Sequence, residues 1–109
     1  MRATTLVGVL MAAVACSAAV DVGIFDDTRV WSPVYNVETG AAMTELRAIW
    51  EARGAVWHQT DVLSESFLSQ VSVFYTSQIL QQNLTAAEQT AIVNWVKAGG
   101  TLVVTADCG

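Results

Sequence analysis

Polar residues that could contact a small ligand follow the apolar segments of this chain. The candidates are carboxylates, hydroxyls and one tryptophan: Asp26, Asp27, Trp31, Thr76, Ser77 and Asp107. In an open parallel sheet, ligands bind beyond the carboxyl ends of the strands, so residues that follow different strands meet at one rim. This rim is acidic and hydroxylated, and Arg29 is its one cation.

Nucleotide cofactors do not fit that rim. A dinucleotide fingerprint needs G-x-G-x-x-G after the first strand, so that the backbone can approach a pyrophosphate. The segment 26–29, Asp-Asp-Thr-Arg, has no glycine, and its two carboxylates would repel phosphate; a flavin mononucleotide site fails for the same reason. A receiver domain would share the acidic pair, but it needs an aspartate where this chain has Thr76 and Ser77. We therefore expect no cofactor.

Soft-ligand metal chemistry is also not expected. The chain has two cysteines, Cys16 and Cys108, and one histidine, His58, with no second Cys or His near it. Zinc sites use clusters of such residues at short spacing. Because Cys16 lies in a predicted export signal, the remaining chain holds only Cys108 and forms no internal disulfide. His58 is expected to be a packed or rim residue.

The elements that would position these residues are clearest near the carboxyl terminus. Thr85 and Glu88 have the spacing of a capping box, which predicts the start of a helix. An apolar stripe follows at helical spacing, made of Ala91, Ile92, Trp95 and Val96. Gly99 can close the helix in a left-handed conformation. The segment 101–105 is short and β-branched, which predicts a strand buried on both faces, with Leu102, Val103 and Val104 inaccessible to water.

The preceding chain alternates strands and helices. The expected elements are a strand at 20–25, a loop at 28–37, a helix at 40–53 capped by Thr39, a strand at 55–59, a helical turn at 64–70 and a strand at 71–75. In the helix at 40–53, the predicted inner face consists of Met43, Leu46, Ile49 and Trp50. The long loop carries Trp31 and Tyr35, which either form a binding wall or cover the end of the sheet. This order predicts an α/β three-layer sandwich with a parallel, flavodoxin-like sheet of about four strands.

The amino terminus predicts export. Arg2 precedes an apolar run at 6–15 that is too short to span a bilayer, and small residues follow it. Residues 1–19 are therefore read as a signal peptide cleaved before Val20, which makes the protein secreted or periplasmic. The alternatives are a lipobox at 13–16, with membrane attachment through lipidated Cys16, and an uncleaved helix.

Length and charge restrict the remainder. The chain has 109 residues and a formal net charge of −5. Because residues 1–19 contain Arg2 and no acid, residues 20–109 carry −6 and form one small domain. Such a domain lacks the basic face that a phosphate backbone requires, so nucleic acid is not an expected partner.

Three runs of residues resemble the class I glutamine amidotransferase-like superfamily. They are 71–75 (VSVFY), 84–88 (LTAAE) and 92–105 (IVNWVKAGGTLVVT), of which the stretch VKAGGTLVVT is the most specific. The nearest branch is the one found as the trimerisation domain of some β-galactosidases and in related exported proteins. The resemblance covers residues 20–109 but only the first half of a typical domain, so we expect the chain to be truncated.

The resemblance implies two alternative functions. Catalytic members carry a nucleophilic cysteine on the turn after this last strand, which makes Cys108 the candidate nucleophile of a hydrolase or amidotransferase fragment. However, the glycine that precedes such a cysteine is absent, the family's His and Glu partners come from later segments, and Asp107 opposes thiolate formation. The preferred hypothesis is an exported, non-catalytic binding or assembly module associated with a carbohydrate-active enzyme. Its final strand would form an unprotected sheet edge, which is explained first by a fragment of a longer chain and otherwise by cover from another protein or a second copy.

Overall fold

The chain forms a parallel four-stranded sheet with helices on both faces. The computed structural model describes residues 18–77 and 80–105. Its elements are β1 (Val20–Phe25), η1 (Pro33–Tyr35), η2 (Ala41–Met43), α2 (Thr44–Glu51), β2 (Ala55–Thr60), α3 (Glu65–Leu68), β3 (Val73–Ser77), α4 (Ala86–Lys97) and β4 (Thr101–Thr105). The strand order is β2-β1-β3-β4, and all three pairings are parallel. The predicted α/β class with a flavodoxin-like sheet is therefore confirmed.

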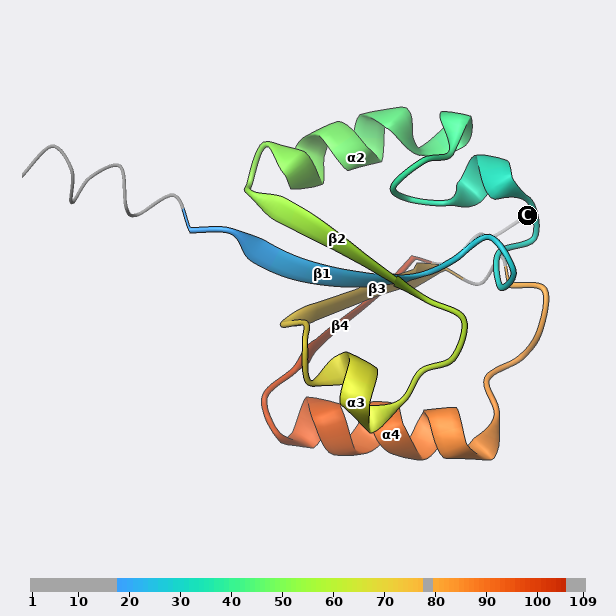
Figure 1. Cartoon of the computed structure of the whole chain (residues 1–109), viewed down its shortest axis with the longest axis vertical. Helices are drawn as coiled ribbons and strands as arrows, with labels where there is room; N and C mark the ends of the chain where they lie inside the picture. Colours follow the sequence, from blue (N-terminus) through green and yellow to red (C-terminus); the bar gives the residue numbers. More distant parts are fainter. Residues whose placement is uncertain (1–17, 78–79, 106–109) are drawn as a thin grey trace, which may run out of the picture.

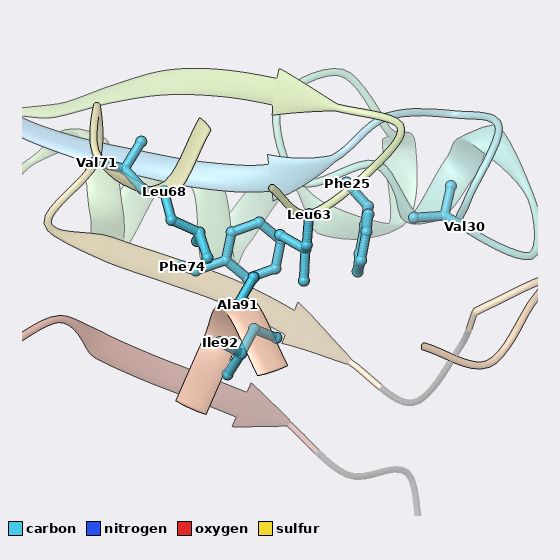
Figure 2. Close-up of a cluster of buried hydrophobic side chains, with 8 residues drawn as sticks. All are labelled: Phe25, Val30, Leu63, Leu68, Val71, Phe74, Ala91 and Ile92. Carbon is cyan, nitrogen blue, oxygen red and sulfur yellow. The ribbon is translucent and has the colours of Figure 1, made fainter. Parts of the chain in front are cut away.

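Two apolar clusters lie on opposite faces of the sheet. Figure 1 shows α3 and α4 on one side of the strands and α2 with the short 3-10 turns on the other. On the α3–α4 side, the rings of Phe25 and Phe74 meet edge to face at 5.2 Å between centroids, and Leu68 and Ile92 pack around them (Figure 2). The cluster on the α2 side contains Val22, Ile24, Val37 and Tyr75. Alternation along β1 explains this division, because successive strand residues point to opposite faces.

The capped helix begins and ends as predicted. Thr85 accepts a hydrogen bond from the Glu88 N–H, and the Glu88 side chain accepts one from the Thr85 N–H, which completes the capping box. Gly99 follows the helix with φ of 112°, a conformation that favours glycine. The inner stripe is narrower than predicted, because Val96 is 42% exposed while Ala91 and Ile92 are buried.

The start of the preceding helix was predicted wrongly. Thr39 is not its N-cap: a 3-10 turn over Ala41–Met43 comes first, and Met43 precedes α2 without a side-chain cap. The cause is the close approach of Gly40 to the η1 turn, where a Cβ on Gly40 would lie 2.2 Å from the Val34 carbonyl oxygen. The inner face was also overestimated, because Ile49 is 57% exposed.

Two other boundaries differ from the sequence expectation. The third strand spans Val73–Ser77, two residues later than predicted, so that Thr76 and Ser77 belong to the strand instead of following it. The helical turn is shorter than predicted, because Ser64 is the N-cap of α3 and accepts a hydrogen bond from the Phe67 N–H.

The expected burial of the last strand is wrong. β4 is a strand as predicted and pairs in parallel with β3, but it lies at the edge of the described sheet. Leu102 and Val103 are half-buried, and Val104 is 58% exposed. An edge strand has one neighbouring strand instead of two, so its side chains receive less cover than those of a central strand such as β1.

Helices long and apolar enough to cross a bilayer do not occur in the described ranges, 18–77 and 80–105.

Candidate functional site

The crevice at the carboxyl ends of the strands is largely filled. The strand order reverses between β1 and β3, which is where open parallel sheets bind ligands. In this chain, Val30 forms an antiparallel bridge with Leu80 across the crevice, and the Gln81 N–H donates to the Arg29 carbonyl at 2.8 Å. The pocket that the described residues leave beneath them has a volume of about 10 Å³, at the lower limit for one water molecule.

The predicted rim residues are only partly brought together. Thr76 and Ser77 line the small cavity, whereas Asp26, Asp27 and Trp31 do not. Asp26 accepts hydrogen bonds from the Thr28 N–H and hydroxyl, and Asp27 accepts one from Asn36, so both carboxylates shape the loop after β1. The other predicted positions, Asp107, Cys108 and Cys16, lie outside the described residues.

Trp31 is the exposed aromatic residue of that loop. Its side chain is 66% exposed, and its ring stacks on Tyr35 at 6.1 Å between centroids with an interplanar angle of 27°. Neither residue lines the small cavity at the carboxyl ends of the strands. This position fits neither a wall of that cavity nor a buried cover of the sheet.

Asn36 holds the long loop together from a buried position. Its Nδ2 donates to Asp27 at 2.7 Å and to Gln59 at 3.1 Å, while its Oδ1 accepts from the Glu38 and Thr39 N–H groups at 2.9 and 3.2 Å. The side chain is 1% exposed. Both donor hydrogens and both acceptor lone pairs of the amide are thus engaged, within the loop and with Gln59 of β2.

We expect Asn36→Ala to lower the free energy of unfolding by about 1–3 kcal/mol, because it removes a buried amide that makes four hydrogen bonds and leaves the Glu38 and Thr39 N–H groups without their acceptor. Asn36→Asp should cost at least as much, since its second oxygen would face the Asp27 carboxylate. Urea denaturation measures both. Equal stability of Asn36→Asp and the parent chain would show that the amide donor has no role.

A buried ion pair joins three segments on the α3–α4 side. The Arg29 guanidinium donates to both oxygens of Glu88, from Nη1 to Oε2 at 2.7 Å and from Nη2 to Oε1 at 3.1 Å. Glu88 also accepts the Leu63 N–H at 2.9 Å and the Thr85 N–H at 3.0 Å. Arg29 further donates to the Asp61 carbonyl at 2.7 Å, and its guanidinium carbon lies 4.5 Å from the centre of the Phe25 ring. The loops after β1 and β2 and the start of α4 are thereby fixed to one another.

The electrostatics of Glu88 follow from these contacts. The hydrogen bonds from Arg29 lower the pKa of the Glu88 carboxyl from 4.5 to about 2, with further lowering by the Leu63 and Thr85 N–H groups and by the charge of Arg29. Burial alone would raise this pKa, because it disfavours the charged form. Glu88 is 1% exposed, so the carboxylate acts as a structural anchor and is closed to solvent.

Sequence reasoning did not find this pair. Glu88 was recognised only as a capping residue, and Arg29 only as the one cation of the rim. Their separation of 59 residues gives no local pattern. A usable signal was the solitary arginine in a loop flanked by acids, because a cation that is enclosed by the fold needs a carboxylate partner.

The free edge of β4 is uncharged and apolar. The Thr101 N–H donates to the Ser72 carbonyl at 3.1 Å, toward β3. Because backbone groups of successive strand residues point to opposite edges, the N–H and C=O groups of Leu102 and Val104 point outward. Residues 101–105 include no proline and no charged residue, although natural edge strands commonly carry one of these to prevent pairing with other chains.

Helix α4 extends the apolar surface of that edge. Val93 and Val96 are 49% and 42% exposed. They lie on the flank of α4 turned away from α3, because Ala87 and Ala91 line the groove between the two helices. Because α3 precedes β3 and α4 follows it, and β4 lies beyond β3 in the sheet, we place this flank on the β4 side. We call Val93, Val96, Leu102 and Val104 the β4 edge surface.

The opposite edge of the sheet, β2, has different chemistry. His58 Nε2 lies 2.9 Å from Asp21 Oδ1, Gln59 donates to Glu38 at 2.7 Å, and the Trp57 indole donates to Glu51 at 3.0 Å. Polar partners therefore occupy three successive side chains of β2. His58, expected to be a packed or rim residue, is a partly exposed partner of Asp21 on β1.

The fold and these surfaces define a small parallel α/β domain. Within the described ranges, no three His, Cys, Asp or Glu side chains are grouped so that they could hold a metal ion. Comparison of the chain with protein-family models, curated proteins and solved structures finds no significant match.

Proposed function

We propose that this domain is an exported binding or assembly module, without catalytic activity, that accepts a β-strand of a partner along β4. The resemblance to the non-catalytic branch of the amidotransferase-like fold motivates this proposal, as does the amino-terminal segment that predicts export. The observation that carries it is the β4 edge, where, among the described residues, an uncharged, half-exposed strand pairs with β3 alone beside an apolar helix flank.

Strand addition suits this surface for two physical reasons. Backbone hydrogen bonds to an edge strand supply affinity, and alternate side chains of the added strand supply specificity. An added strand would place every second side chain beside Val96 and Val104, which are now 42% and 58% exposed. By contrast, the pocket that the described residues form at the switch point has a volume of only about 10 Å³, which is too small for a ligand larger than water.

The test is binding of extended peptides to the 109-residue chain. A panel of fluorescein-labelled octapeptides with alternating Val and Thr is titrated by fluorescence anisotropy, each with a matched peptide that carries a central proline. We expect the alternating Val/Thr peptides to bind with micromolar dissociation constants and the matched proline-containing peptides to bind at least tenfold more weakly. The Val104→Lys variant should also bind the Val/Thr peptides at least tenfold more weakly, because a lysine on an edge strand opposes strand addition.

Val56→Lys is the matched control, because Val56 is 44% exposed on the other edge strand, β2. It should leave the peptide affinity unchanged. Equal losses in the two lysine variants, or no binding by any peptide together with no self-association of the chain, would contradict a binding role for β4.

A further inference from the structure

We propose that the strand accepted by β4 is β4 of a second copy, paired antiparallel about Val103, so that two sheets join into one. This inference rests on the proposed function and names its partner. A two-fold interface must be self-complementary, with residue i facing j and j facing i. The β4 sequence, Thr-Leu-Val-Val-Thr, meets this condition, because its reversed order again places Thr opposite Thr, an aliphatic residue opposite an aliphatic one, and Val103 opposite itself.

The directions of the backbone N–H and C=O groups of β4 agree with that register. Leu102 and Val104 direct their N–H and C=O groups outward, since Thr101 is bonded toward β3. In an antiparallel pair, two facing residues either exchange both hydrogen bonds or exchange none. A pairing centred on Val103 places Leu102 opposite Val104 of the second copy, and both of these residues direct their N–H and C=O groups outward. Val103 then faces its counterpart in a pair without hydrogen bonds.

The side chains agree as well. Leu102 belongs to the apolar cluster on the α4 face, and Val104, two residues further, points to the same face. In the joined sheet, Leu102 of one copy covers the exposed Val104 of the other. The α4 helices then lie side by side on one face of the joined sheet, with Val93 and Val96 of each copy between them. The complete β4 edge surface is covered in this way.

The lack of charge on β4 leaves pairing with a second copy unopposed at the strand itself. The five residues of β4 carry no charge, so no like charges meet at the two-fold axis. The whole chain carries −5, which repels a second copy over longer distances. Salt screens that repulsion between exposed charges. The association is therefore expected to tighten at higher ionic strength, whereas binding to a basic partner would weaken.

The first experiment is sedimentation equilibrium of the full chain in 50 and 500 mM salt. We expect a monomer–dimer equilibrium that tightens with salt, a dissociation constant at least tenfold higher for Val104→Lys, and no change for Val56→Lys. A chain that stays monomeric at about 100 μM in both salts, or a dimer that Val104→Lys leaves intact, would overturn the proposal.

The second experiment fixes the register by disulfide trapping. In a Cys16→Ser, Cys108→Ser background, Val103→Cys should cross-link on mild oxidation, because facing residues in a pair without hydrogen bonds have Cα atoms about 4.5 Å apart, which a disulfide can bridge. Val104→Cys is the matched control. It should cross-link much more slowly, because residue 104 of each copy faces Leu102 of the other copy and the two introduced cysteines do not face each other. Equal rates would overturn the register.

The two proposals can fail separately. Peptide binding that depends on Val104, together with a monomeric chain, would leave the binding module in place and exclude a second copy as its partner. Failure of both peptide binding and self-association would exclude both.

Discussion

Glu88→Gln is expected to lower the free energy of unfolding by about 3–5 kcal/mol, because it leaves the Arg29 guanidinium buried without a countercharge. The substitution preserves shape, so the loss reports on charge and hydrogen bonding. Glu88 accepts four hydrogen bonds, two on each oxygen, from Arg29, Leu63 and Thr85. An amide replaces one oxygen by an NH₂ group, which would face donors whichever way the side chain is turned.

Urea or guanidinium denaturation at pH 7 provides the measurement. Glu45→Gln is the matched control: Glu45 is an exposed acid in the first turn of α2, so its loss should cost about 0.3–1 kcal/mol. A double-mutant cycle with Arg29→Met isolates the pair, and the double variant should be more stable than the sum of the single losses predicts. A loss for Glu88→Gln no larger than that for Glu45→Gln would refute the anchoring role of the ion pair.

The architecture could be predicted because local signals in this chain agree with one another. β1 was placed correctly by its apolar run, and α4 by a capping box at one end and a glycine at the other. Each signal acts over a few residues and needs no partner elsewhere in the chain. The alternation of such segments then leaves a parallel sheet as the arrangement that buries their apolar faces.

Features that depend on distant contacts were not predictable in the same way. The 3-10 start of the helix preceding β2 is imposed by Gly40 against the η1 turn, and by Arg47, which donates to the Val37 and Gly40 carbonyls. The exposure of Val104 follows from strand order, which the composition of β4 does not reveal. A β-branched apolar strand looks the same in sequence at the centre of a sheet and at its edge.

The candidate site shows the same limit. The polar residues that follow the strands were predicted to form a ligand site. Asp26 and Asp27 instead accept hydrogen bonds from Thr28 and Asn36 and so stabilise the loop after β1. The loop residues Val30 and Leu80, which were not considered, close the crevice by bridging across it. β4 lies at the edge of the described sheet, a position that depends on a strand order that the local signals do not define.

The stability penalty of Glu88→Gln is expected to shrink by about 3 kcal/mol as the pH falls from 5 to 2. The folded-state pKa of Glu88 is about 2, below the ordinary value of 4.5, so the unfolded state binds a proton more readily than the folded state. The stabilisation is therefore complete above about pH 4.5 and is lost as the pH falls toward 2. A difference of that size in pKa corresponds to about 3 kcal/mol.

Denaturation midpoints of the parent chain and the variant, measured in parallel from pH 7 to pH 2, test this dependence. Other carboxylates titrate in both proteins, so their contributions cancel in the difference, and only the titration of residue 88 remains. Because the Arg29 guanidinium stays charged throughout, the shift reports on the carboxylate alone. A difference in stability that stays constant over this range would mean that Glu88 titrates alike in the folded and unfolded states, and the charge-assisted pairing with Arg29 would then contribute nothing to the folded domain.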